Sequence, residues 1–481
     1  MQSGRESRVE SRESTSLVLR PSSLDCVYAL LFGLFLGLAV WKFGNPVILD
    51  HKIIPPTSPA EFWSFAWPAH WSDWLWPPFA LAGGWLALSN KARWLGTRWL
   101  WLLPLLWLGW QLLSATRTAD AFLTTTTLWQ FAGCVACYFI GALVLGHERA
   151  LRWLLVGVLA AFAFCLVRAA DQKLFEFPAS RQMLMEGERV GWTNFPPQIL
   201  LEMKREGTVI TTNGVDVANP AILARTAKGR VMGTLVYPNA LAGIILLLLP
   251  VSLALAFNGT RQFKPVIRVA VIVMTCGLGG LGLFWSGSKA GWLLALALAG
   301  IWLLRLNWPT RLKWTVLTTV LVIGLALFGL RFHNYFTSGA TSASARLDYW
   351  RAAVQTTRTN PLFGTGPGTF QRPYERIKSP DAEMARLAHN DYLEQFSDSG
   401  IPGGLFYVMW IGLALLTAGK RAWRSGGSLH FALFLGTLGW FVQGLMEFSL
   451  YVPALAWTAF TLLGYLLQGS VNPFDKGRAT G

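Results

Sequence analysis

The chain has 481 residues, of which 53% are hydrophobic and only 14% are charged. A soluble protein of this length needs a polar surface that so few charged residues cannot cover, so the composition excludes an ordinary water-soluble enzyme. The formal net charge of +16 is also typical of nucleic-acid-binding proteins, but the distribution of the basic residues gives it another meaning.

Apolar stretches recur from Leu24 to Leu467, and each is long enough to cross roughly 30 Å of hydrocarbon. Because these runs are continuously apolar rather than alternating, they predict helices and not the strands of a barrel. The sequence therefore predicts an all-α integral membrane protein with about twelve transmembrane helices. The expected spans are 24–41, 74–89, 99–114, 123–145, 151–169, 231–257, 267–285, 289–305, 313–331, 402–418, 430–448 and 452–468.

Basic residues mark one side of this predicted membrane. Short connections on the other side hold little beyond Arg117 and Lys289. By the positive-inside rule, the basic side is cytoplasmic, so we expect both the polar N-terminus (1–23) and the tail (469–481) in the cytoplasm. Since topology accounts for the basic excess, no nucleic-acid partner is expected. The basic connections include Lys91, Arg98, Arg149, Arg261, Arg311 and Lys420.

Three longer segments then face outward. Residues 42–73 are rich in proline and tryptophan and are expected on the membrane surface. Residues 170–230 separate the N-terminal helices (24–169) from the helices of 231–331, and are expected to form a periplasmic loop. This loop shows strand-like alternation at Thr208–Thr212, followed by an Asn213-Gly214 turn. It could gate an acceptor or only shield a site.

The third outward segment, residues 332–400, is expected to form a helical periplasmic cap between spans nine and ten. Ser344 to Arg358 reads as a helix ended by Asn360-Pro361, with Arg346 and Trp350 on one face and Arg351 on another. A second helix is predicted from Ser379, through His389, to Gly400. Pro402 can then open the membrane helices of 401–468.

Several motifs in this order resemble the O-antigen ligase and polymerase superfamily of bacterial envelope glycosyltransferases. The resemblance extends from about Arg230 to Leu467 and is only topological before that. The motifs are Ser286-Gly287-Ser288-Lys289-Ala290-Gly291-Trp292, then Arg346 with Trp350, then Pro361-Leu362-Phe363-Gly364-Thr365-Gly366-Pro367-Gly368, then His389-Asn390-Asp391-Tyr392-Leu393.

The resemblance implies an enzyme of the bacterial inner membrane that needs no metal and no cofactor. It would take a glycan from undecaprenyl diphosphate at the periplasmic face and transfer it to lipid A-core or a related acceptor. Essential basic residues of the family correspond to Lys289 and Arg346, and an essential histidine corresponds to His389. The first basic position is usually arginine; lysine keeps the charge but loses the bidentate fork, which leaves donor preference open.

The chemistry of these residues is compatible with that reaction. An acceptor hydroxyl would attack the anomeric carbon, with inversion, and displace the diphosphate. Lys289 and Arg346 would stabilise the negative charge on the phosphate oxygens, and a neutral His389 would accept the hydroxyl proton. Each residue also has an ordinary structural alternative. His389 could be a polar residue on a helix surface, Lys289 could anchor a span, and Arg346 could lie on a solvated helix face.

Further residues are expected to bind substrate. Gly366 and Gly368 could offer backbone N–H groups to an anion, or the turn could only position two helices. Pro238 is expected inside a span, where it would kink the helix. Glu447 could pair with a basic site residue or make a structural hydrogen bond. The substrate-binding residues inferred are Arg230, Asn239, Arg351, Gly366, Gly368, Asn390 and Asp391.

Other functions remain open at this point. A repeat-unit polymerase or a protein O-oligosaccharyltransferase of the same superfamily would use the same donor and similar residues. A bicarbonate-type transporter of the same fold is the rival from a different class, but a carrier should place its polar sites near the bilayer midplane. A degenerate member that binds lipid-linked glycan without turnover is the third alternative.

Overall fold

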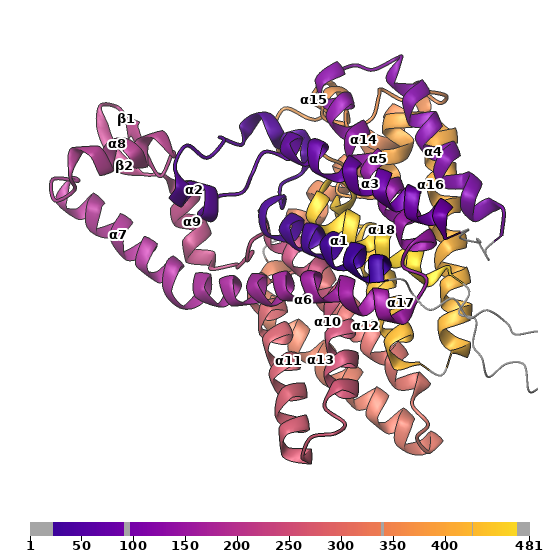
Figure 1. Cartoon of the computed structure of the whole chain (residues 1–481). Helices are drawn as coiled ribbons and strands as arrows, with labels where there is room; N and C mark the ends of the chain where they lie inside the picture. The colour runs from indigo at the N-terminus through magenta and orange to yellow at the C-terminus, as the bar shows by residue number, and fades with distance from the viewer. Residues whose placement is uncertain (1–22, 91–96, 338–340, 426, 469–481) are drawn as a thin grey trace, which may run out of the picture.

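The structure, a computed structural model, describes residues 23–90, 97–337, 341–425 and 427–468 (Figure 1). The predicted cytoplasmic tail, 469–481, and all but Ser23 of the predicted N-terminal segment lie outside the described residues. Every predicted span overlaps a helix, although some of the predicted bounds differ from those of the helices. These helices are α1 (Ser23–Lys42), α3 (Ser72–Ser89), α4 (Trp99–Ala115), α5 (Ala121–Leu143), α6 (Glu148–Asp171), α10 (Pro238–Gly259), α11 (Pro265–Ser286), α12 (Lys289–Arg305), α13 (Thr310–Thr337), α16 (Asp391–Arg424), α17 (Ser428–Gln443) and α18 (Pro453–Leu466).

The helices confirm an all-α membrane protein. Seven of the described helices are long and apolar enough to cross a membrane, and α4, α17 and α18 are shorter apolar helices. In α11 and α13 the most apolar windows have a mean hydropathy of 2.0, yet only 17% of each window is buried inside the protein. Apolar surface of this extent is not stable in water, so these helices face lipid. The exact number of twelve spans stays a prediction.

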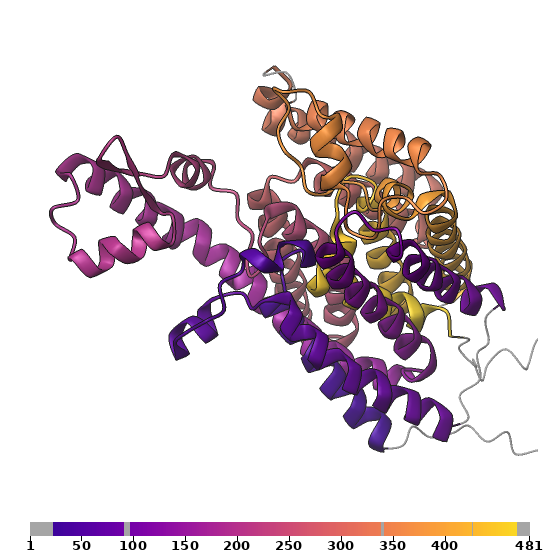
Figure 2. The same cartoon turned by 90° about the horizontal axis from the view of Figure 1, so that it is seen from above.

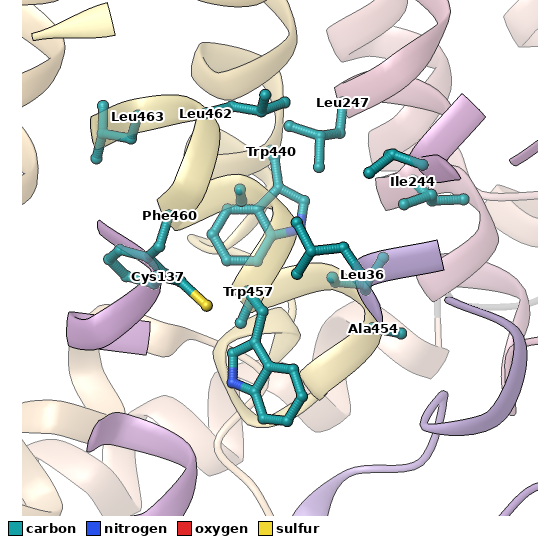
Figure 3. Close-up of a cluster of buried hydrophobic side chains, with 14 of the residues drawn as sticks. Leu36, Cys137, Ile244, Leu247, Trp440, Ala454, Trp457, Phe460, Leu462 and Leu463 are labelled. Atoms are coloured by element: carbon teal, nitrogen blue, oxygen red, sulfur yellow. The ribbon is translucent and has the colours of Figure 1, made fainter. Parts of the chain in front are cut away.

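A tryptophan-rich core joins helices from both ends of the chain (Figure 3). Trp440 of α17 and Trp457 of α18 are each 1% exposed, and they lie beside Leu36 of α1 and Cys137 of α5. The helices also approach closely: a Cβ built on Gly141 would lie 2.1 Å from a backbone oxygen of α18. Small residues at such crossings let membrane helices pack backbone to backbone. The C-terminal helices α17 and α18 therefore share one core with the N-terminal helices α1 and α5.

The segment 42–73 is anchored to the end of α1. It forms η1 (Val47–Lys52), α2 (Pro59–Ser64) and η2 (Ala69–Trp71). Lys42 is 1% exposed, and its ammonium group donates hydrogen bonds to the carbonyl oxygens of Phe62, Trp63 and Phe65. This buried cation is thus satisfied by backbone oxygens, which fix the return of the chain over α1.

The segment 170–230, predicted to form a periplasmic loop, contains a small folded unit, and its periplasmic placement stays a prediction. α6 continues through a π-helical turn, η3 (Gln172–Glu176), into α7 (Phe177–Val190), and the unit extends away from the other helices (Figures 1 and 2). The predicted strand is confirmed as β1, whose Thr212 pairs with Val215 of β2. The other elements are α8 (Pro197–Arg205), β1 (Val209–Thr212), β2 (Val215–Ala218) and α9 (Pro220–Lys228).

Pro238 does not kink a span. The structure places it at the first turn of α10, where a proline lacks only an N–H that the helix does not use. Tyr237 before it is extended, with φ −146° and ψ 153°, as the residue before a proline prefers. The span therefore begins at residue 238 and not at 231.

The cap segment 332–400 is only partly as predicted. The first helix is confirmed as α14 (Thr341–Thr359), and a short helix that we did not predict, α15 (Gln371–Ile377), follows it. The predicted helix from Ser379 to Gly400 is wrong, because residues 378–390 are not helical and α16 begins only at Asp391. Asn390 caps α16 by accepting hydrogen bonds from the N–H groups of Tyr392 and Leu393. The helix axis breaks at Ser399–Gly400, just before Pro402.

Candidate functional site

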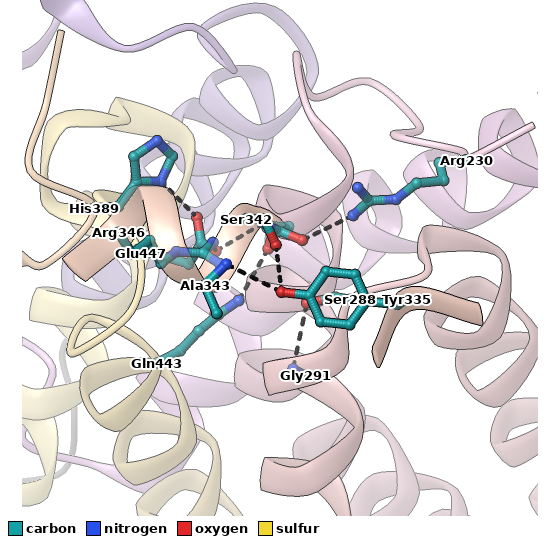
Figure 4. A network of polar contacts seen from close by, with 11 residues as sticks. Arg230, Ser288, Gly291, Tyr335, Ser342, Ala343, Arg346, His389, Gln443 and Glu447 are labelled. Carbon is teal, nitrogen blue, oxygen red and sulfur yellow. Dashed lines mark hydrogen bonds and ion pairs between the residues drawn. The ribbon is translucent and has the colours of Figure 1, made fainter. Parts of the chain in front are cut away.

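Glu447, in the loop after α17, is the centre of a polar cluster (Figure 4). Its side chain is 1% exposed, and its Oε1 accepts hydrogen bonds from Arg346 Nη2 at 2.6 Å and from Asn239 Nδ2 at 2.7 Å. Its Oε2 lies 3.7 Å from His389 Nδ1. One buried carboxylate thus brings together α10, α14 and the turn before α16.

His389 is held in an unusual backbone conformation. Its φ is +51°, in the left-handed region that residues other than glycine seldom adopt. The turn is fixed from both sides: Ala388 N–H donates to the Glu394 carboxylate at 3.0 Å, and Asn390 caps the helix that follows. The imidazole is 29% exposed, stacks on Tyr349 and meets Phe448 edge-on, with 4.7 Å between the ring centroids. Strain maintained by this many contacts is common at functional sites.

Lys289 reaches the same region from the first residue of α12, which Ser288 caps. Its ammonium nitrogen lies 3.8 Å from the ring centroid of Tyr335 and 5.3 Å from that of Phe332. Tyr335 in turn accepts a hydrogen bond from the N–H of Ala343 at the start of α14. Among the described residues, the contacts of Lys289 are thus aromatic rather than acidic, so no described carboxylate neutralises its positive charge.

Arg230 extends the cluster on its other side. Its Nη2 donates to Asn239 Oδ1 at 3.0 Å, and its Nε donates to the carbonyl oxygen of Ser286. Burial lowers the pKa of Arg230; Glu447 opposes this shift, while Arg346 and Arg331 reinforce it. The guanidinium therefore lies among other cations.

Positive charge exceeds negative charge at this site. The charges of Arg230, Arg346 and Arg331 all act on Lys289. The only ion pair between these four cations and a described carboxylate, within 4 Å, is that of Arg346 with Glu447. A group of cations with one partner is suited to an anionic ligand, since a phosphate would bring charge-assisted hydrogen bonds.

Asn390 and Asp391 do not face this cluster as free ligands. Asn390 is occupied by capping α16. Asp391 is 2% exposed, and its carboxylate accepts a hydrogen bond from the N–H of Leu450. The N–H of Asp391 donates to the carbonyl oxygens of Gly444 and Glu447, at 2.7 and 3.1 Å. Asp391 thus fastens the His389 turn to the Glu447 loop, while Asn390 caps α16, and their substrate-binding role stays a prediction.

The glycine-rich turn is also occupied by internal contacts. The N–H of Gly366 donates to the carbonyl oxygen of Asp398 at 2.8 Å, and the N–H of Gly368 donates to the Asp398 carboxylate at 2.7 Å. Both glycines have positive φ, and a Cβ on Gly366 would lie 2.4 Å from Thr118 Oγ1. Of the two interpretations, the geometry favours a turn that positions helices over a nest for an anion.

Arg351 lies apart from the cluster. It pairs with Asp348 at 3.0 Å, and its side chain is 76% exposed. Besides Tyr335, Phe332 and Phe448, the site includes two further residues that we did not single out. They are Arg331, in the last two turns of α13, and Tyr349, which packs on His389. A basic residue at the end of a span, next to the outward segment, was a usable signal for Arg331. Nothing in the local pattern marks Tyr349.

The fold and this site together define a class: a multi-pass helical membrane protein with a cationic, histidine-containing site formed by distant helices. Residues 271–408 match the family model described as O-Antigen ligase, which supports the superfamily that the motifs resemble. The matched residues include Lys289, Arg346 and His389, and the family supports glycan transfer of the ligase or polymerase type. No curated protein sequence matches the chain.

Proposed function

We propose that the chain is an O-antigen ligase-like glycosyltransferase that moves a glycan from undecaprenyl diphosphate to an acceptor such as lipid A-core. The reaction would take place at the periplasmic face of the bacterial inner membrane, with both termini in the cytoplasm. One observation carries the proposal: a buried Glu447 joins Arg346, Asn239 and His389 beside further cations that form no ion pair with a described carboxylate.

The diphosphate of the donor would bind the cations of this cluster. Arg346 is oriented by Glu447, and Arg230 by Asn239, so both guanidinium groups are preorganised rather than mobile. Preorganised charge stabilises the diphosphate as its bond to the sugar breaks, without the cost of reorienting solvent. Since a diphosphate is already a good leaving group, no strong acid is needed.

His389 would act as the base. With Nδ1–H directed at the nearby Glu447 carboxylate, Nε2 would keep its lone pair and could accept the proton of the acceptor hydroxyl. The 3.7 Å separation is longer than a hydrogen bond, and such contacts commonly tighten when substrate binds. The hydroxyl oxygen then bonds to the anomeric carbon as the diphosphate leaves with the electron pair of the broken bond.

A reconstituted transfer assay tests this function. Purified protein in liposomes would receive an undecaprenyl-diphosphate glycan with lipid A-core, with a second lipid-linked repeat unit, or with an acceptor protein. We expect a mass increase equal to the glycan on lipid A-core. Elongation of the repeat unit would identify a polymerase, and a modified protein would identify a protein oligosaccharyltransferase. Unchanged acceptors in all three arms would refute the proposal.

Lys289 is expected to contribute its charge and not its shape. Lys289→Ala should weaken binding of farnesyl diphosphate, a short donor analogue, roughly ten- to hundredfold, because one charge-assisted interaction is lost. Lys289→Arg should bind it as the native protein does. Isothermal titration of the purified variants measures this, with Lys264→Ala, which removes an exposed lysine before α11, as the control. Equal affinities for all variants would remove Lys289 from the site.

A further inference from the structure

A second basic cavity lies between the α4–α5 turn, the C-terminal end of α14, and α15. Its volume is about 480 Å³, and the turn that carries Arg117 is joined to the glycine-rich turn by a hydrogen bond of 2.7 Å from the N–H of Ala119 to the carbonyl oxygen of Thr365. The polar lining includes Arg117, Gln355, Thr359, Asn360, Arg372 and Arg376. None of the residues around Glu447 contributes to it.

One of the three arginines is neutralised. Arg372 donates to Asp120 Oδ2 from both Nε and Nη2, at 3.0 and 2.5 Å. Burial favours the protonated form of Asp120, but the hydrogen bond from Arg372 and those from the backbone outweigh it and lower the pKa of this carboxyl. Asp120 also caps α5 by accepting from the N–H of Leu123. The Arg372–Asp120 pair is therefore a fixed part of the cavity wall.

The other two arginines are not neutralised. Within the described parts of the chain, neither Arg117 nor Arg376 has a carboxylate within 4 Å. Both are exposed at the rim of the same cavity, so their repulsion is relieved only by solvent and counterions. A phosphomonoester, with a charge of roughly −2, would balance the two cations and accept several hydrogen bonds from them.

The cavity is connected to the His389 site through α15. Tyr374 of α15 meets Tyr349 edge-on at 5.3 Å, and Tyr349 stacks on His389. On the same helix, Arg372 and Arg376 line the cavity. Along α14, the distance from Arg346 to Thr359 corresponds to roughly 20 Å at the rise of an α-helix. An oligosaccharide with a phosphate at one end could occupy both places at once.

We propose that this cavity binds the phosphomonoester of a phosphorylated saccharide, and so holds an acceptor whose hydroxyl group lies at His389. The choice of acceptor depends on the proposed function, whereas the binding of the phosphate does not. A binding site some distance from the reacting atoms positions the acceptor and selects it, because binding energy there reduces the entropy lost at the reacting centre.

Binding of a matched pair of probes tests this site. The full-length protein in nanodiscs would be titrated with a fluorescent oligosaccharide that carries one phosphomonoester, and with its dephosphorylated twin, by fluorescence anisotropy. We expect the phosphorylated probe to bind at least about tenfold more tightly. In the Arg117→Gln/Arg376→Gln variant, the ratio of the affinities for the two probes should fall nearly to one. The matched control, Arg181→Gln/Arg189→Gln, removes two cations from α7 and should keep the native ratio.

Two further arms separate the outcomes. Saturating farnesyl diphosphate should leave the probe bound; if it displaces the probe, the phosphate lies in the Glu447 cluster and the proposal is overturned. Equal binding of both probes, or an unchanged preference in the Arg117→Gln/Arg376→Gln variant, would overturn it as well. Phosphate-dependent binding without transfer to any acceptor would keep this site and reject the glycosyltransferase.

Discussion

Replacing His389 with asparagine is expected to reduce glycan transfer by roughly 10²- to 10⁴-fold, the usual contribution of a general base. Asparagine is the informative substitution because it tolerates the left-handed conformation that His389 adopts at φ +51°, yet its amide cannot accept a proton. His389→Ala removes the base too, but it adds backbone strain. The initial rate of transfer in liposomes measures both variants.

Donor binding provides the control for this prediction. His389→Asn should bind farnesyl diphosphate with native affinity, because the cations that would hold the diphosphate are untouched. His147→Ala, which removes an exposed histidine before α6, should transfer at the native rate. A His389→Asn enzyme with a near-native rate would show that the imidazole is not the base, whereas a loss of both binding and transfer would indicate a disturbed site.

The membrane helices were predictable because their signal is local. Each span is encoded by one continuous apolar run. The Asn213-Gly214 turn marks its hairpin in the same local way, because both residues must adopt positive φ. Helix α14 was predictable for a similar reason: its end at Asn360-Pro361 is encoded by adjacent residues. The prediction fails where two residues are equally suitable as the N-cap of a helix, as Ser379 and Asn390 are.

The helix start at Ser379 was wrong because tertiary contacts decide between these two caps. Tyr374 donates a hydrogen bond to the carbonyl oxygen of Glu383, and Glu394 accepts one from the N–H of Ala388, so the segment between is held out of a helix. Both contacts are visible only once α15 and α16 are in place. The hydrogen bond that Asp391 accepts from the N–H of Leu450 is equally invisible in the local sequence, because Leu450 lies far along the chain.

The reactive groups of the candidate site could be predicted from the sequence, but their arrangement could not. Lys289, Arg346 and His389 stand in recognisable motifs, and the structure brings all three to one region. Their arrangement depends on Glu447, which has no motif of its own and is 101 residues from Arg346 in the sequence. Its role as ion-pair partner was one of two alternatives until the fold placed it.

Loss of the Glu447 carboxylate should markedly destabilise the protein. Glu447→Ala leaves Arg346 Nη2 and Asn239 Nδ2 without their acceptor, and removing one partner of a buried pair costs about 3–5 kcal/mol. Arg346 is 23% exposed, so solvent can reach it and the lower end of that range is expected. Urea unfolding in detergent, followed by tryptophan fluorescence, measures the change.

A double-mutant cycle shows whether loss of the Arg346–Glu447 ion pair causes this destabilisation. Arg346→Ala/Glu447→Ala removes both partners, so it should be less destabilising than the sum of the two single changes. Glu186→Ala breaks an exposed ion pair with Arg189 on α7 and should change stability by no more than about 0.5 kcal/mol. If Glu447→Ala resembled this control, the carboxylate would not organise the site. Strictly additive effects would mean that Glu447 stabilises the fold without acting through Arg346.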